Sequence, residues 1–266
     1  MILTRWEMTT EAIERTRILG IPVDALTMAT ALERAVELAK DRTTASYAVA
    51  INPEKTFAIR QSAELAQFVE NAALALPDGI GVVWASRLLN GRKIERVPGA
   101  DLAEAVCARS GAEGLNLFFY GAKEEASAAA VAELRRRYPD IRVVGRRNGY
   151  VKIEEMNALA QEIADSNADV LLVALGSPRQ ERWIAEYAAR TKVGLCLGVG
   201  GTLDTFAGTV KRAPLLWQKM NLEWLYRLLK QPTRIWRCRL LACYGAEVFA
   251  RLLFVKPFVG KRDGNR

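Results

Sequence analysis

The chain has 266 residues, of which 50% are hydrophobic and 26% charged, and its formal net charge is +8. This length can bury the core of one large domain, or of one domain with an appendage. There is no histidine, which excludes Ser-His-Asp and Cys-His mechanisms and leaves Asp, Glu, Lys, Tyr or Cys for proton transfer near neutral pH.

Short apolar runs alternate with longer amphipathic segments from residue 46 onward. Strands are expected over residues 46–51, 72–76, 115–120, 141–144, 170–175 and 193–197. Helices are expected over residues 54–69, 80–89, 100–109, 124–138, 153–165 and 179–190. This alternation predicts βαβ units and a mainly parallel sheet flanked by helices, an α/β Rossmann-like fold.

Ligands of such folds bind outside the carboxyl ends of the strands, so the residues at those ends are the candidate site. Asp78 follows one expected strand, where it could act as a general base with a pKa raised by partial burial, or serve as a turn or N-cap residue. Arg96 could neutralise a phosphate, with Asp101 capping the next helix. Gly79 and Gly176 lie in strand-end turns that let a ligand approach the backbone.

A glycine-rich loop follows the expected strand over residues 193–197. Its Gly198, Gly200 and Gly201 could cradle a diphosphate, or form a tight turn capped by Asp204. The loop matches neither G-x-G-x-x-G nor a Walker motif. Asp204 could alternatively orient the loop or contact a sugar hydroxyl.

The helix expected over residues 179–190 opens with two polar side chains. We interpret Glu181 as a helix-capping acid, because acidic side chains suit the first turn. Gln180 has less structural reason to be there and could hydrogen-bond a base or a sugar.

The last 58 residues form a basic arm. Residues 209–266 contain 13 Lys or Arg against 3 Asp or Glu, whereas residues 1–208 contain 25 against 27. Because Trp and Leu are interleaved with Arg, this arm suits an anionic membrane surface, although a solvated helix pair capping the core would have the same composition. Residues 240–259 are expected to lie on a membrane or to pack on the protein. Candidate phosphate ligands in the arm are Arg212, Arg227, Arg234, Arg237 and Arg239.

Several absences narrow the expected function. No Asp-x-Asp motif and no CxxC pair occur, so neither a metal nor another cofactor is expected, and fixed cations and dipoles would stabilise a leaving diphosphate. The N-terminus lacks the apolar region of a secretory signal. The sequence also lacks an uncharged apolar stretch of about 18 residues, so no spanning helix is expected.

Together the strand-end motifs resemble the WecG/TagA/CpsF family of bacterial glycosyltransferases over about residues 17–240. The resemblance rests on the following stretches: ILGIPVD (18–24), NPE (52–54), PDGIG (77–81), ERVPGAD (95–101), GSPRQE (176–181), GVGGTLD (198–204), AG (207–208), KRAP (211–214), LEWLYR (222–227) and QPTRIWR (231–237). It implies an N-terminal extension (1–16), a catalytic core (17–208) and a membrane-associating appendage (209–266).

The resemblance also implies an activity. Family members transfer a sugar, such as N-acetylmannosamine or another hexose, from a UDP-sugar to a polyprenyl-diphosphate-linked acceptor, with inversion. Such enzymes work at the inner face of the cell membrane in exopolysaccharide, teichoic acid or related synthesis, and a homo-oligomer is one expected form. By resemblance Asp78 is the base, Arg96 and Gln180 are active-site residues, and Asn52 shares the pocket. Arg227, Arg234 and Arg237 would approach the diphosphate.

One departure and two alternatives accompany this resemblance. The family often has threonine where this chain has Ala50, which bears on donor identity. A nucleotide-binding oxidoreductase would need a dinucleotide fingerprint that is not evident. A nucleic-acid-binding protein would explain the basic arm but not Asp78 or the glycine loop, so no nucleic acid is expected as a partner.

Overall fold

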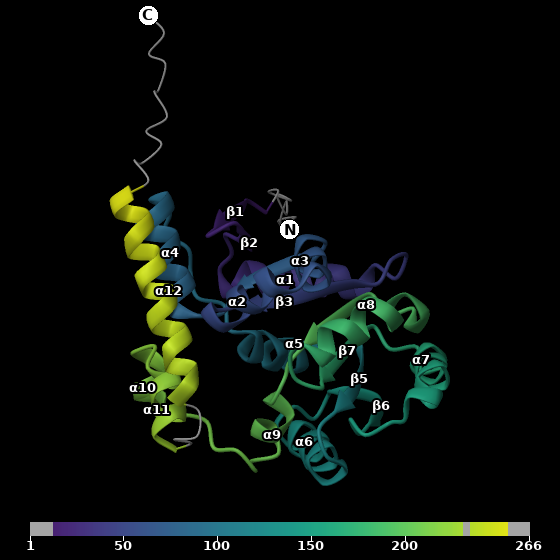
Figure 1. Cartoon of the computed structure of the whole chain (residues 1–266). Coiled ribbons are helices and arrows are strands. Elements are labelled where there is room, and N and C mark those ends of the chain that lie inside the picture. The colour runs from purple at the N-terminus through teal and green to yellow at the C-terminus, as the bar shows by residue number, and fades with distance from the viewer. Residues whose placement is uncertain (1–12, 231–234, 255–266) are drawn as a thin grey trace, which may run out of the picture.

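A six-stranded parallel sheet forms the centre of the computed structural model, which describes residues 13–230 and 235–254 (Figure 1). The strands run in the order β4-β3-β8-β7-β5-β6, so the expected α/β Rossmann-like fold is confirmed. Most of the predicted N-terminal extension lies outside the described residues. The bounds are β3 (Ser46–Ile51), β4 (Leu74–Pro77), β5 (Asn116–Gly121), β6 (Arg142–Arg147), β7 (Val170–Ala174) and β8 (Leu195–Gly198).

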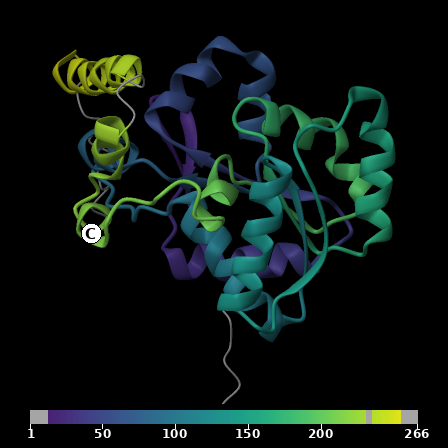
Figure 2. The same cartoon turned by 90° about the horizontal axis from the view of Figure 1, so that it is seen from below.

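Helices cover both faces of this sheet, as the views in Figures 1 and 2 show. Side chains alternate along β5: Phe118 and Tyr120 enter one buried apolar cluster, and Leu117 and Phe119 enter the other. Burial on both faces is what a parallel sheet requires. The core helices are α1 (Met28–Lys40), α2 (Pro53–Gln61), α3 (Ala63–Glu70), α4 (Ile80–Asn90), α5 (Gly99–Glu113), α6 (Glu124–Arg137), α7 (Met156–Asp165), α8 (Arg179–Thr191) and α9 (Thr202–Phe206), with a 3-10 turn η1 (Ile153–Glu155).

The core differs from the sequence predictions in several places, among them α1 and α9, where no helix was expected. The single helix expected over 54–69 is divided at Ser62, whose hydroxyl accepts a hydrogen bond from the Leu65 amide and so starts α3. An additional hairpin, β1 (Arg15–Ile18) and β2 (Ile21–Asp24), precedes the sheet. Its two turn residues, Leu19 and Gly20, both have positive φ, as a tight two-residue hairpin turn requires.

The basic arm contains three helices in its described part, α10 (Leu215–Lys219), α11 (Glu223–Lys230) and α12 (Ile235–Phe254). Figure 1 shows α12 running alongside α4 at one side of the molecule. Tyr244 and Val248 of α12 are buried, and Arg60 of α2 forms a two-pronged ion pair with Glu247 at 2.6 and 2.8 Å. Residues 240–254 therefore pack on the protein, one of the two arrangements expected for this segment.

The other side of the arm remains apolar and exposed. Phe249, Leu253 and Phe254 of α12 project into solvent, as do Leu215 and Leu216 of α10. Within residues 13–230 and 235–254, no helix combines the length and the apolar character needed to cross a bilayer.

We expect Tyr244→Ala to detach α12 from the core. The ring is 3% exposed and lies against the first turn of α4, at Gly81, so its removal should cost about 2 kcal/mol of unfolding free energy. Urea unfolding and limited proteolysis would measure this. Phe249→Ala removes an exposed ring of the same helix and should change stability by less than about 0.5 kcal/mol. Equal effects of the two variants would contradict the docking role of Tyr244.

Candidate active site

Asp78 lies just beyond β4, at the carboxyl edge of the sheet. Its backbone N–H donates to the Ile51 carbonyl of the neighbouring β3 at 3.0 Å, and its Oδ1 accepts a hydrogen bond from the Gly99 amide at 3.0 Å. Burial raises the pKa of the Asp78 carboxyl, while the Gly99 hydrogen bond, the charge of Arg96 and the Asn52 side chain act in the opposite direction. The result is a half-buried carboxyl of raised pKa that is held in place by the Gly99 amide, a property that suits a general base.

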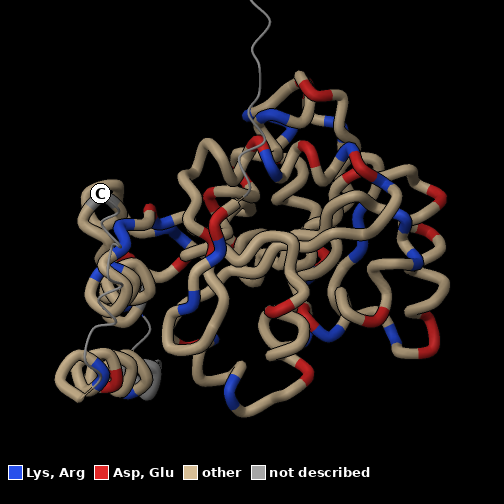
Figure 3. The backbone as a smooth tube through the Cα atoms, turned by 90° about the horizontal axis from the view of Figure 1, so that it is seen from above, with Lys and Arg blue, Asp and Glu red and all other residues tan. Residues whose placement is uncertain are grey.

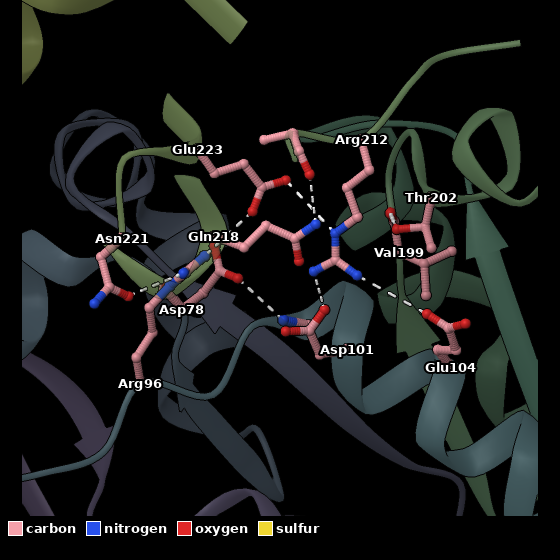
Figure 4. A network of polar contacts seen from close by, with 12 residues as sticks. Asp78, Arg96, Asp101, Glu104, Val199, Thr202, Arg212, Gln218, Asn221 and Glu223 are labelled. Carbon is pink, nitrogen blue, oxygen red and sulfur yellow. Dashed lines mark hydrogen bonds and ion pairs between the residues drawn. The ribbon is translucent and has the colours of Figure 1, made fainter. Parts of the chain in front are cut away.

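Arg96 lies directly beside Asp78 (Figure 4). Its Nε donates to the Asp78 backbone carbonyl at 2.8 Å, and its Nη1 donates to Asn221 Oδ1 at 3.1 Å. Its Nη2 lies 3.6 Å from Glu223 Oε2. The structure thus brings together Asp78 and Arg96, which the sequence predicted as catalytic residues, and adds two arm residues to their surroundings.

The turns after β3 and β4 contact each other. Asn52 caps α2, because its Oδ1 accepts a hydrogen bond from the Lys55 amide at 2.9 Å. A Cβ on Gly79 would lie 2.8 Å from Pro53 Cδ, so glycine is needed at position 79 for this close packing. Both residues lie at the candidate site, as predicted, and both also have a structural role there.

Gln180 holds the glycine loop in place. It is buried, and its Oε1 accepts a hydrogen bond from the Gly200 amide at 3.0 Å. A Cβ on Gly198 would lie 2.7 Å from Gln180 Nε2. Gln180 therefore has more structural reason to be there than the sequence suggested, because its amide shapes the loop proposed to receive a diphosphate.

Glu181 is not the helix cap that the sequence suggested. The N-cap of α8 is Pro178, which follows a cis peptide bond, and Glu181 points inward to pair with Lys55 Nζ at 2.5 Å. Both side chains are almost fully buried, and Gln180 Nε2 donates to the same Glu181 oxygen at 3.3 Å. This pair links α2 to α8 beneath the carboxyl edge. Its lysine was not among the predicted site residues, although it lies only three positions after Asn52.

The remaining glycines have backbone roles. Gly176 and Gly200 have φ values of +76° and +54°, in the region that favours glycine. Gly201 is the N-cap of α9, so the alternative that Asp204 caps this turn is wrong. Asp204 instead lies within the first turn of α9, where its backbone carbonyl accepts hydrogen bonds from Val210 and Thr209.

Arg212 is the centre of a second charged cluster, between the core and the arm (Figure 4). It forms ion pairs with Asp101, with Glu104 at 3.9 Å and with Glu223 at 3.8 Å. The helix-capping role expected for Asp101 is wrong, since α5 begins at Gly99 after Pro98 and Asp101 turns to Arg212. A surface cavity of about 340 Å³ is lined by Arg212, Asp101, Glu104, Tyr138 and Gln218 among others.

Three predicted phosphate ligands cannot be placed in this site. Arg234 and the side chains of Arg227 and Arg237 lie outside the described residues. Two arm residues that do reach the site, Asn221 and Glu223, were not predicted. Glu223 belongs to a stretch that carried the family resemblance, but a first-turn acid in a helix is too common to indicate a site by itself.

The comparison with known families gives one match. Residues 16–257, most of the chain, match the model described as the Glycosyl transferase WecG/TagA/CpsF family. The chain therefore belongs to this glycosyltransferase family, as its motifs predicted, and acts on sugar donor and acceptor substrates. The match favours the transferase over the oxidoreductase and nucleic-acid alternatives.

Proposed function

We propose that this family member transfers a hexose, such as N-acetylmannosamine, from a UDP-sugar to a polyprenyl-diphosphate-linked sugar, with inversion and without a metal. The observation that carries the proposal is the half-buried Asp78 at the carboxyl edge of the sheet, whose carboxyl is held by the Gly99 amide and whose backbone carbonyl is held by Arg96. This is the edge at which α/β folds bind nucleotides.

Asp78 takes the proton from the acceptor hydroxyl in this reaction. The acceptor oxygen then forms a bond to the anomeric carbon on the face opposite UDP, and the bond between that carbon and the diphosphate oxygen breaks. UDP leaves with the bonding electron pair. Arg96, Arg212 and the N–H groups of the loop 198–201 stabilise its charge, so catalysis rests on positioning and fixed electrostatics.

The arm, in this proposal, keeps the enzyme on the inner face of the cell membrane. Its described helices stand to one side of the core in Figure 3, and they expose apolar side chains among basic ones. Such a surface binds anionic lipid through apolar insertion and charge, so binding weakens as salt rises. This location fits a role in exopolysaccharide or teichoic acid synthesis.

The test of this function is UDP release from a panel of UDP-sugars in EDTA, with and without a polyprenyl-diphosphate-GlcNAc analogue. Acceptor-dependent release from one donor is the expected result, and product stereochemistry by NMR should show inversion. Release that requires an added divalent metal would contradict metal independence. Absence of release from every donor, together with absence of UDP binding by calorimetry, would overturn the proposed donor class.

We expect Phe249→Glu with Phe254→Glu to lower co-sedimentation with anionic vesicles about ten-fold. Both rings are exposed, so the fold should be unaffected while apolar insertion is lost and lipid charge is repelled. Turnover of a water-soluble acceptor analogue should stay at the wild-type level. Ile153→Glu, an equally exposed site far along the chain, is the control. If the double variant still binds vesicles as the wild type does, α12 is not part of the surface that binds the membrane.

A further inference from the structure

Glu223 is the first residue of α11 and is 7% exposed. Its two carboxylate oxygens face two different guanidinium groups: Oε2 lies 3.6 Å from Arg96 Nη2 and Oε1 lies 3.8 Å from Arg212 Nε. Figure 4 shows this carboxylate between the two arginines. Its first-turn position suits the helix dipole, but the dipole does not explain why the side chain is buried between two cations of the candidate site.

The contacts of Glu223 with these two arginines, at 3.6 and 3.8 Å, are long for ion pairs. Charge-assisted hydrogen bonds between such groups have lengths of about 2.7–2.9 Å, shorter than either contact that Glu223 makes with them. The same arginines bind other oxygens closely, since Arg96 Nε lies 2.8 Å from the Asp78 carbonyl and Arg212 contacts Asp101 directly. An anion with more oxygens than a carboxylate could therefore contact both guanidinium groups at once.

The local charge balance points the same way. Among the described residues, the carboxylates of Asp78, Asp101, Glu104 and Glu223 lie near the cations Arg96 and Arg212, and Lys55 adds a positive charge near Asp78. A diphosphate placed between Arg96 and Arg212 would meet the negative charge of Glu223 at short range, which is unfavourable in a partly buried site. Glu223 is the one of the four that contacts both arginines and belongs to the arm.

We infer that Glu223 is a resident anion in the diphosphate position between Arg96 and Arg212, and that the diphosphate of the substrate displaces it. The inference rests on the proposed function and adds a consequence to it. Binding of the diphosphate moves the start of α11, so occupation of the active site and the position of the membrane-facing arm are coupled.

Calorimetry with inorganic pyrophosphate and with UDP tests this on the full chain. Glu223→Gln keeps the shape of the side chain and removes the competing charge, so both anions should bind at least about five-fold more tightly than to the wild type, within the usual range of coupling between sites. Glu223→Ser, which also empties the space, should act in the same direction. Glu104→Gln removes a charge near Arg212 that does not contact Arg96, and should change either affinity by less than two-fold, about 0.4 kcal/mol.

The outcomes separate the inference from the proposed function. Tighter pyrophosphate binding by both Glu223 variants, with no UDP binding by any form, would support the resident anion and overturn the uridine donor. If folded Glu223→Gln binds pyrophosphate and UDP no more tightly than the wild type does, the inference is overturned. The proposed function would be unaffected, because the wild-type enzyme could still transfer sugar. An equal increase in affinity in Glu104→Gln would also overturn the inference. The increase would then come from the lower negative charge of the site in general, and not from removal of a displaced carboxylate.

Discussion

Replacing Asp78 by Asn should lower kcat for sugar transfer by about 10³-fold, within the range that a general base contributes. The amide keeps the size of the side chain and can still accept a hydrogen bond from the Gly99 amide, but it cannot take the acceptor proton. UDP affinity should remain close to that of the wild type, because the arginines and the glycine loop are unchanged. Single-turnover transfer with saturating donor, together with UDP calorimetry, measures both quantities.

Asp165→Asn is the matched control for this substitution. Asp165 is an exposed carboxylate at the end of α7, where it accepts a hydrogen bond from Gln161 at 2.8 Å. Transfer by this variant should equal that of the wild type. Activity of Asp78→Asn within ten-fold of the wild type would show that another group takes the proton.

The raised pKa of Asp78 predicts opposite pH effects on activity and on stability. A base works when ionised, so kcat/KM should fall as pH drops through the folded-state pKa of Asp78, which lies above its ordinary value of 3.8. A pKa raised by folding contributes stability below the unfolded pKa, and this contribution is lost as pH rises through the folded pKa. Asp78→Asn should therefore have a higher Tm than the wild type at neutral pH. The difference should narrow as pH falls through the raised folded-state pKa, and it should disappear below the unfolded-state pKa of about 4.

Calorimetric scans of both proteins across this pH range check the sign. A lower Tm for Asp78→Asn at neutral pH would mean that the ionised carboxylate stabilises the fold. The pKa of Asp78 would then be depressed, and the argument for a base of raised pKa would fail.

The sequence predicted the sheet and its edge better than it predicted the contacts beneath them. Alternating apolar runs locate strands because a parallel sheet buries both faces, and strand ends then locate Asp78 and the glycine loop. The hairpin at residues 15–24 was not predicted, because its strands have only four residues each and the second strand ends at a buried polar residue, Asp24. Its carboxylate accepts hydrogen bonds from Arg15 and the Ala75 amide, partners that lie 9 and 51 positions away.

The roles of polar residues were predicted from their positions in helices, because the sequence does not show which residues they contact. Glu181 and Asp101 occupy the first turns of helices, where acids commonly favour the dipole, so a local role was the natural interpretation. Their actual partners, Lys55 and Arg212, lie more than 100 positions away in the chain. Only the tertiary structure brings such pairs together, so the local interpretation failed at both.

Lys55→Met should lower the free energy of unfolding by about 3–5 kcal/mol, the cost of breaking a buried ion pair. Methionine fills most of the lysine volume but leaves the Glu181 carboxylate buried without its cation. Glu181 Oε2 already has no hydrogen-bond partner among the described residues, and Oε1 would retain only Gln180 at 3.3 Å. Because Gln180 holds the Gly200 amide, the glycine loop should loosen as well. Urea unfolding measures the stability change, and UDP calorimetry measures the loosening as a weaker Kd.

The loss of stability in Lys55→Met should come from the unpaired Glu181 charge and not from the loss of the lysine side chain itself. The double variant Lys55→Met with Glu181→Gln removes both charges, so it should recover most of the stability lost in the single variant. Lys40→Met removes an exposed lysine paired with Glu113 at 2.7 Å, and should cost at most about 1 kcal/mol. A Lys55→Met cost as small as that of Lys40→Met would mean that water reaches Glu181. The link between α2 and α8 would then not hold the loop at the carboxyl edge, and the order of that loop would have to come from Gln180 alone.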